Sequence, residues 1–356
     1  MAQIFKTLDW MNDWPFDEVI DVRSPSEYAE DHIPGAINLP VLSDSERAEV
    51  GTIYTQKDPF LARKIGAALV AKNAAAHLQG PLADRTGGWR PLVYCWRGGQ
   101  RSGSFTSILA QVGWRADLIE GGYRSYRRLV VQALYEQPLA HRVVLVDGGT
   151  GTAKTRLLTL MAEAGAQVID LEALAEHRGS LFGGLGAPQP AQKMFESRLI
   201  RAIMALDPGR PVFLEAEGNK IGDILIPPSL WKAMIAAPHV QLSAPLTARA
   251  DFLMRAYDDL VVDGALLAAR LEKLKAFHGA EQTAAWQALA AQGDFHQLAM
   301  QLMERHYDPR YGKAAERRAG CLTEYQMPDL SDESLGKTAA DILRRFNTNA
   351  SLPDLA

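Results

Sequence analysis

The chain has 356 residues, of which 47% are hydrophobic and 22% are charged, and its formal net charge is −4 at pH 7. This length predicts two or three domains, and the charge excludes a uniformly basic surface but not a local basic patch. The two cysteines, Cys95 and Cys321, exclude a disulfide scaffold. The sequence shows no signal-peptide pattern at its start and no apolar run of the ~18 residues that a membrane span needs. We therefore expect a cytoplasmic protein with no membrane segment and with reduced thiols.

Strand and helix patterns alternate in the first third of the chain. Strands are expected at residues 16–23, 35–40 and 90–96, and a last strand-like run at 115–123 closes the pattern. Helices are expected at residues 24–32, 62–78 and 100–113, and Ser24 and Pro25 suit the start of the first helix. Alternating strands and helices predict a parallel sheet that is covered on both faces.

A second strand and helix pattern follows a boundary near Pro138. Strands are expected from Arg142 and at residues 166–171, 211–217 and 239–245, with helices at 190–206 and 228–237 between them. From Leu246 onward the sequence reads as helical, and the tail after Asn347 is expected to fray. The predicted fold class is α/β, with a parallel-sheet domain at 1–137, a second αβ domain at 138–245 and a helical C-terminal region at 246–356.

The stretch "VYCWRGGQRS" places a thiol where a predicted strand ends. A thiolate is the nucleophilic form of cysteine, and backbone amides, a helix N-terminus and arginine side chains all favour it. Gly98 and Gly99 allow a tight loop, while Arg97 and Arg101 add positive charge after Cys95. We predict an anion-binding loop with a nucleophilic cysteine; the simpler alternative is an inert cysteine buried in a strand.

A second glycine-rich loop, "VVLVDGGTGTAKT", runs from an apolar strand to a Lys-Thr pair at a helix start. Loop amides and a helix N-terminus bind phosphate, the lysine neutralises charge, and the threonine hydroxyl can bind Mg²⁺. Ala153 stands where the consensus has glycine. A plain glycine-rich turn is the alternative. The predicted phosphate-binding residues are Gly148, Gly149, Thr150, Gly151, Thr152, Ala153, Lys154 and Thr155.

Other polar residues follow predicted strands of the second αβ domain. Glu215 and Glu217 come after an apolar strand and could touch a metal ion or its water; solvated carboxylates are the alternative. Asp170 either faces a ligand or caps a helix. His177 and Arg178 belong to the loop at residues 176–184, which either covers an anion or is an ordinary surface loop. No protein-only metal site is predicted.

Two basic clusters contain tyrosines. The first holds Arg124, Arg127 and Arg128 beside Tyr123 and Tyr126. The second, "ERHYDPRYGKAAERR", contains basic residues at several positions: Arg305, Arg310, Lys313, Arg317 and Arg318. Arginines beside aromatic rings suit phosphate contacts and base stacking on single-stranded RNA, whereas solvated helix faces are the simpler explanation.

Three stretches of the first domain resemble a rhodanese domain. "VIDVRSPSEYAEDHIPGAINLP" is similar to its opening signature, "YCWRGGQRS" to its active-site loop and "IEGGYRSYRR" to its closing segment. The resemblance implies that Cys95 carries a chalcogen as a persulfide or perselenide, in a cradle of Trp96, Gly98, Gly99, Gln100 and Ser102. The loop is one residue longer than in many small rhodaneses, and Cys-x5-Arg also matches cysteine phosphatases.

The order of a rhodanese-like domain, a P-loop NTPase-like domain and a helical region resembles the tRNA 2-selenouridine synthase family. The supporting motifs are "CWRGGQRS", "EGGYRSYRR", "GGTGTAKT", "HRGSLFG", a Glu-x-Glu pair and "HYDPRYG". The resemblance implies exchange of sulfur for selenium at a wobble 2-thiouridine of tRNA, with selenophosphate as donor. It also implies prior S-geranylation from geranyl diphosphate. "EAEGNK" departs from the family pattern, in which a serine is expected after the second glutamate.

Three other functions fit some of these motifs. A P-loop kinase or ATPase with a regulatory rhodanese-like module would hydrolyse ATP without Cys95. A cysteine phosphatase would use Cys95 and Arg101 on phosphate esters. An RNA-binding protein with a decayed site would bind tRNA without modifying it.

Overall fold

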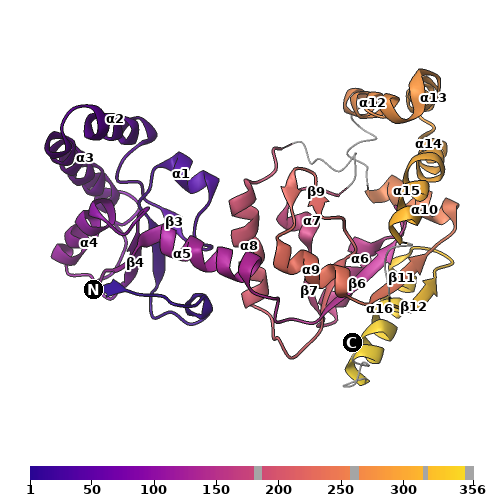
Figure 1. The fold of residues 1–356 in the computed structure, drawn as a ribbon, viewed down its shortest axis with the longest axis horizontal. Helices are drawn as coiled ribbons and strands as arrows, with labels where there is room; N and C mark the ends of the chain where they lie inside the picture. Colours follow the sequence, from indigo (N-terminus) through magenta and orange to yellow (C-terminus); the bar gives the residue numbers. More distant parts are fainter. Residues whose placement is uncertain (180–186, 257–263, 316–319, 349–356) are drawn as a thin grey trace. The chain divides into compact units, whose positions relative to one another are not determined.

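The structure is a computed structural model and describes residues 1–179, 187–256, 264–315 and 320–348. These residues form two compact units (Figure 1). Unit 1 is Met1–Pro138 with Pro190–Ala205, and unit 2 is Leu139–Gln189 with Leu206–Ala356. Parts of three sequence expectations fall outside the described residues: the frayed tail, residues 180–184 of the glycine-rich loop, and Arg317 and Arg318.

Unit 1 is built on a parallel sheet, as the sequence predicts. Among the described residues it has five strands, in the order β1 (Ala2–Gln3), β5 (Asp117–Ile119), β4 (Pro91–Tyr94), β2 (Glu18–Asp21) and β3 (Ile37–Asn38). Leu92 and Val93 of the central strand β4 are fully buried, and burying one such side chain stabilises a fold by roughly 1.5–3 kcal/mol. The sheet is therefore the rigid base from which the cysteine loop leaves.

The helices of unit 1 include one that the sequence analysis did not predict, α2. Its start carries a capping box, in which the Ser43 hydroxyl accepts from the Glu46 amide and the Glu46 carboxylate accepts from the Ser43 amide. The helical segments are η1 (Asp9–Met11), α1 (Pro25–Glu30), α2 (Asp44–Gln56), α3 (Pro59–Gln79), α4 (Gln100–Val112), α5 (Gly122–Val131), the π-helical η2 (Gln132–Glu136) and α8 (Gln192–Met204).

Helix α8 belongs to unit 1 although its sequence lies between two strands of unit 2. Glu196 is 1% exposed, is ion-paired with Arg127 and accepts a hydrogen bond of 2.6 Å from the Tyr135 hydroxyl. Arg201 donates to the carbonyl oxygen of Met11 at 2.7 Å. A buried carboxylate needs such partners, so these contacts fix α8 to the first unit.

Unit 2 also contains a parallel sheet, with five strands among the described residues. Their order is β12 (Cys321–Gln326), β11 (His239–Ser243), β6 (Val143–Gly148), β8 (Val212–Glu215) and β7 (Gln167–Ile169). Strands β9 (Lys220–Ile221) and β10 (Ile224–Leu225) form an antiparallel pair. The sequence analysis was wrong about strand β12, because it predicted a helix for this segment. The strand lies at the edge of the sheet, where it pairs with only one neighbouring strand and its polar residues are tolerated.

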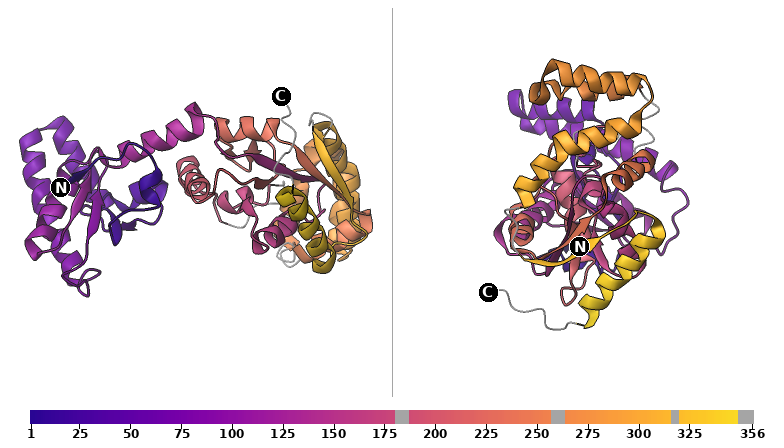
Figure 2. Two further views of the ribbon diagram at one scale, coloured as in Figure 1. Left: turned by 90° about the horizontal axis from the view of Figure 1, so that it is seen from below. Right: turned by 90° about the vertical axis from the view of Figure 1, so that its right-hand side faces the viewer.

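Figure 2 shows the C-terminal helix α16 (Asp332–Thr348) beside strand β12, and its side chains contribute to the core of unit 2. Leu335, Ile342 and Phe346 are buried, and the Phe346 ring lies edge-on to Phe213 of β8 with centroids 5.1 Å apart. The other helical segments are α6 (Lys154–Glu163), α7 (Leu171–Leu174), α9 (Pro228–Ala236), α10 (Leu246–Ala256), α12 (Gly264–Glu272), α13 (Lys275–Ala291), α14 (Phe295–Leu302), the π-helical η3 (Met303–Tyr307) and α15 (Asp308–Ala315).

The described part of the chain contains no helix with both the length and the apolar character that crossing a membrane requires.

Candidate functional site

The cysteine loop connects β4 to α4 at the carboxyl end of the first sheet. Gly98 has a φ of +64°, and a Cβ atom there would lie 2.6 Å from the carbonyl oxygen of Ile119. Gly122 has a φ of +58°, and a Cβ atom there would clash with the carbonyl oxygen of Cys95. The two glycines therefore allow the cysteine loop and the start of α5 to pack backbone against backbone, a contact that other residues would block.

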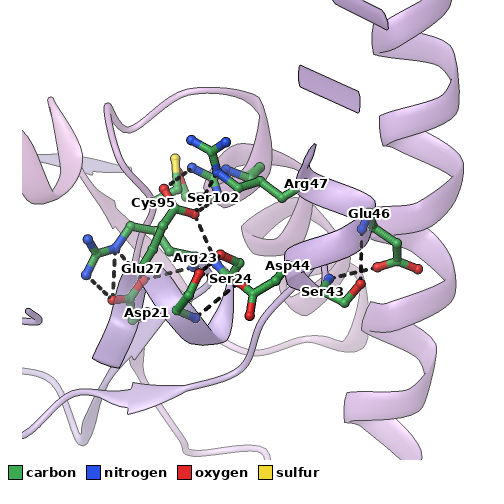
Figure 3. Close-up of polar contacts among 12 residues, drawn as sticks. Asp21, Arg23, Ser24, Glu27, Ser43, Asp44, Glu46, Arg47, Cys95 and Ser102 are labelled. Carbon is green, nitrogen blue, oxygen red and sulfur yellow. Dashed lines mark hydrogen bonds and ion pairs between the residues drawn. The ribbon is translucent and has the colours of Figure 1, made fainter. Parts of the chain in front are cut away.

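The Cys95 sulfur is more enclosed than the sequence analysis expects for a nucleophile. The residue is 3% exposed and belongs to the apolar core, because it directly follows the buried strand β4. Its sulfur accepts a hydrogen bond of 3.2 Å from the Ser102 hydroxyl, which is itself fully buried (Figure 3). The thiol is therefore held between the end of β4 and the first turn of α4.

The two arginines of the loop differ in their surroundings. Arg101 lies in the first turn of α4 and donates to both carboxylate oxygens of Glu27, at 2.7 and 3.3 Å. Burial opposes ionisation of Glu27, but Arg101 outweighs it and lowers the pKa of that carboxyl. Arg97 is exposed, whereas Trp96 stacks on Tyr123 with ring centroids 5.3 Å apart. Only Arg97 is thus free to approach an anion without breaking an ion pair.

A buried ion pair supports the same sheet edge. Arg23 and Asp21, at most 1% exposed, are joined by a contact of 2.6 Å between Nη2 and Oδ2 (Figure 3). The Arg23 guanidinium lies 4.0 Å from the centre of the Tyr123 ring, and the Tyr123 hydroxyl donates to Asp31. Asp21 and Arg23 of the opening signature therefore have a structural role. They position the Tyr123 ring, on which Trp96 stacks.

The phosphate loop connects β6 to α6 in unit 2. Ala153 has a φ of +61° and a ψ of +29°, a left-handed conformation that explains why glycine is the consensus residue. Lys154 bends back over the loop, and its Nζ donates to the carbonyl oxygen of Gly148 at 2.9 Å. The Thr152 hydroxyl donates to the carbonyl oxygen of Gly149 at 2.8 Å. These contacts curl residues 148–153 at the N-terminus of α6, as phosphate binding requires.

Glu215, the last residue of β8, reaches this loop. It accepts a hydrogen bond of 2.9 Å from the Thr155 hydroxyl and lies 3.3 Å from the Lys154 ammonium. Burial opposes the charge of Lys154, but Glu215 and Glu217 outweigh it and raise the pKa of the lysine. Lys154 is therefore cationic at neutral pH.

A cavity of about 410 Å³ lies over the phosphate loop. Carboxylates and Arg178 line one part, and apolar side chains of α10 line another. The lining residues are Thr150, Gly151, Thr152, Ala153, Lys154, Thr155, Glu172, Arg178, Gly179, Glu215, Glu217, Phe252, Leu253, Ala256 and Tyr307. The cavity can hold an anion together with an apolar group.

Glu172 is a site residue that the sequence analysis missed. Carboxylate oxygens of Glu172, Glu215 and Glu217 lie within 4.8 Å of one another. Burial, followed by repulsion from the other two glutamates, raises the pKa of Glu172 to about 9. A Cβ atom on Gly179, whose φ is +67°, would clash with the Glu172 carboxylate. The sequence signal that could have indicated Glu172 is its position at the start of a short helix that directly follows the strand 167–169.

The three carboxylates fit a hard divalent cation. Mg²⁺ prefers oxygen ligands and usually keeps several waters beside one or two carboxylates and substrate phosphates. The raised pKa of Glu172 is what unneutralised negative charge in a partly buried site produces. Glu172, Glu215, Glu217 and the Thr155 hydroxyl are the residues that would hold Mg²⁺ here.

The remaining predicted residues of unit 2 have separate positions. Asp170 caps α7, because its carboxylate accepts from the Ala173 amide at 2.8 Å, and it does not line the cavity. The His177 ring accepts from the Gly179 amide at 3.1 Å and so shapes the turn beside the carboxylates. Arg178 lines the cavity, as an anion contact should.

The basic clusters need one correction. Tyr123 and Tyr126 are at most 2% exposed and Arg127 is ion-paired with buried Glu196, so these three residues serve the fold rather than a surface. Arg124 and Arg128 are exposed.

In the second cluster Arg305 is exposed and donates to Gln282. Arg310 is also exposed; it donates to the His306 carbonyl oxygen and lies 4.8 Å from the centre of the Phe277 ring. Both remain on the surface of unit 2, where an RNA phosphate could reach them.

Known proteins match both units. Residues 141–270 match the family model "tRNA 2-selenouridine synthase AAA domain", and residues 6–129 match that of the rhodanese-like domain. The chain is 33% identical over 338 residues to the tRNA 2-selenouridine synthase of Hahella chejuensis, covering 85% of this chain and 86% of the relative. It is 35% identical over 243 residues to the protein of that name from Nitrosomonas europaea, covering 67% of this chain and 63% of the relative.

Coverage of the relatives varies. For the relatives from Nitrosomonas europaea, Bdellovibrio bacteriovorus and Nitrosomonas eutropha, the alignments span 63%, 65% and 62% of the relative, less than two thirds of its length.

Proposed function

The chain belongs to the tRNA 2-selenouridine synthase family, and from this premise we propose that it modifies the wobble uridine of tRNA. The proposed reaction replaces the sulfur of 2-thiouridine by selenium in two steps. The first uses geranyl diphosphate and the second uses selenophosphate. The cytoplasm, where reduced thiols and tRNA are both present, is the proposed compartment.

Sulfur at C2 of the base is a poor leaving group, and alkylation improves it. In the first step the sulfur attacks C1 of geranyl diphosphate, the C–O bond breaks and diphosphate leaves. In the second step the selenium of selenophosphate adds at C2 and geranyl thiolate leaves, and water then cleaves the P–Se bond so that phosphate is released. Both donors carry phosphate groups, so the reaction needs anion sites beside the base.

The observation that carries the proposal is the composition of the phosphate-loop cavity. Lys154 and the N-terminus of α6 suit a diphosphate, while Phe252, Leu253 and Ala256 of α10 offer apolar contacts for a prenyl chain. Lys154 would neutralise the negative charge that grows on the departing diphosphate. Mg²⁺ held by the three glutamates would supply further charge neutralisation.

Cys95 is assigned to selenium delivery. Ser102 donates to its sulfur, and Arg97 is an exposed cation two residues further along the loop, so a negative charge on sulfur or selenium would be stabilised. Opening of the loop, for which Gly98 and Gly99 provide backbone freedom, would admit the donor.

A nucleotide-hydrolysing enzyme is the second candidate function. The contact between Thr155 and Glu215 is typical of sites that hold a Mg²⁺-nucleotide. Measuring ATP turnover in the absence of tRNA distinguishes the two functions. A kinase or ATPase would turn over ATP without tRNA, and it would still do so in a Cys95→Ser variant.

Mass spectrometry of tRNA nucleosides tests the proposal. Thiolated tRNA is incubated with geranyl diphosphate, selenophosphate or both. We expect Lys154→Ala to lower S-geranylation about 100-fold, the loss typical of removing one charge-stabilising group. We expect Cys95→Ala to abolish 2-selenouridine while geranylation continues.

Two substitutions serve as matched controls. Cys321→Ala removes the other, exposed cysteine, and Lys220→Ala removes a half-exposed lysine of the same unit. Both should behave as wild type. Unchanged products in both Lys154→Ala and Cys95→Ala would remove the two loops from the mechanism.

A further inference from the structure

A cavity of about 800 Å³ lies beside the cysteine loop of unit 1. Helices α2 and α3 form two of its walls, and the residues after Cys95 form the third. The lining residues are Leu42, Arg47, Val50, Gly51, Tyr54, Thr55, Ala62, Arg63, Gly66, Ala67, Val70, Trp96, Arg97, Gln100, Arg101 and Ser104. The cavity is large enough for a nucleotide, and the functions above use only its wall beside Cys95.

The charge of this cavity is positive. Among the described residues no carboxylate lines it, whereas four arginines do: Arg47, Arg63, Arg97 and Arg101. Glu27 pairs with Arg101 at 2.7 Å and with Arg47 at 3.3 Å. Arg63 and Arg97 have no ion pair within the described residues, and both are exposed. An anion entering the cavity would therefore meet two uncompensated guanidinium groups.

Aromatic rings accompany these charges. Tyr54 lines the cavity and is 56% exposed, and Trp96 forms part of the wall next to Cys95. Phe60, in the first turn of the wall helix α3, is 68% exposed but does not itself line the cavity. Exposed rings beside arginines suit stacking on nucleobases.

We propose that this cavity binds nucleotides of the RNA substrate that flank the base to be modified. Arg63 and Arg97 contact backbone phosphates, while Tyr54 and Trp96 stack on bases. The proposal rests on the proposed function, since it names the RNA-binding part of the Cys95 site. It also replaces the surface role expected for Tyr123, which is buried.

The distribution of the side chains favours RNA over a prenyl diphosphate. The arginines come from three helices and a loop, which suits several phosphates along a strand better than a single diphosphate group. The exposed rings of Tyr54 and Phe60 would be unnecessary for a small ligand inside the cavity. Single-stranded RNA presents both phosphates and unstacked bases to such a surface.

The test measures binding of an anticodon stem-loop RNA with wobble 2-thiouridine to the full-length protein over a series of salt concentrations. For Arg63→Gln we expect about fivefold weaker binding and a salt dependence of log Kd reduced by about 0.7, the value for one lost contact to a single strand. For Tyr54→Ala we expect at least roughly fivefold weaker binding with the salt dependence unchanged, because stacking carries no charge.

Arg115→Gln is the matched control. Arg115 is exposed and lies just before β5, so it is at the opposite edge of the parallel sheet from Cys95. The RNA affinity of the Arg115→Gln variant should stay within twofold of wild type. If Arg63→Gln and Tyr54→Ala both bind RNA with wild-type affinity, the inference is overturned while the proposed function stands. The same conclusion follows if these variants lose binding of geranyl diphosphate and keep binding of RNA. A wild-type protein that binds no RNA would instead overturn the proposed function as well.

Discussion

Glu172 lies in surroundings that disfavour the charge of its carboxylate. It is partly buried, and Glu215 and Glu217 add negative charge, so its pKa is raised to about 9 from an ordinary 4.5. The folded state therefore holds a proton that the unfolded state would release. As pH rises from 4.5 through 9, Glu172 makes the metal-free protein progressively less stable.

A Mg²⁺ titration tests this account of Glu172. Mg²⁺ must displace the proton, so its stabilisation of the fold should grow between pH 7 and pH 9. Glu172→Gln should abolish most of the Mg²⁺-induced rise in Tm and make the metal-free Tm less sensitive to alkaline pH. Differential scanning fluorimetry measures both effects. Glu163→Gln, an exposed glutamate of α6, should leave them unchanged, and an equal Mg²⁺ response in both variants would contradict the assignment.

At the scale of elements, the "YDPRY" motif at residues 307–311 stabilises the phosphate loop, although it lies more than 150 residues after that loop in the sequence. Arg249 of α10 is 8% exposed, donates to the carbonyl oxygen of Thr150 at 2.8 Å and is held by both carboxylate oxygens of Asp308. The Tyr311 hydroxyl donates to Asp147, at the end of β6, at 3.1 Å. Helices α10 and α15 thus brace the loop.

Asp308→Asn tests this brace. Loss of the charged partner leaves Arg249 poorly compensated, so we expect the free energy of unfolding to fall by about 1–2 kcal/mol, less than for a fully buried pair because Asp308 is 37% exposed. The KM for geranyl diphosphate should rise more than kcat falls. Asp251→Asn breaks an exposed pair on the same helix and should cost less than about 0.5 kcal/mol, as chemical denaturation can measure. Equal effects of both variants would argue against the brace.

The sequence predicted helices and strands well where a regular spacing of apolar residues coincides with residues that start or end a helix. It predicted them less well elsewhere. Strand β4 and the turn into α6 follow from apolar runs and glycines. Strand β12 was missed because an edge strand with polar residues lacks an apolar run. The pairing of Arg101 with Glu27 could not be predicted either, since the two residues are far apart in sequence and meet only through the sheet.

At the scale of the whole molecule, the two units each have their own hydrophobic core and their own glycine-rich loop at the carboxyl end of a parallel sheet. The family and the α/β class were predicted correctly, because both loops have local signatures. The assignment of α8 to unit 1 depends on tertiary contacts of Glu196, which no local pattern encodes. Separate cores imply that a substitution in one loop leaves the other loop folded.

Sequential treatment with two defective variants tests the division of labour most directly. Thiolated tRNA is first incubated with the Cys95→Ala protein and geranyl diphosphate, repurified, and then given to the Lys154→Ala protein with selenophosphate. We predict that 2-selenouridine forms in this order and fails to form when either incubation is omitted. Geranylated tRNA that the Lys154→Ala protein cannot convert would contradict the account.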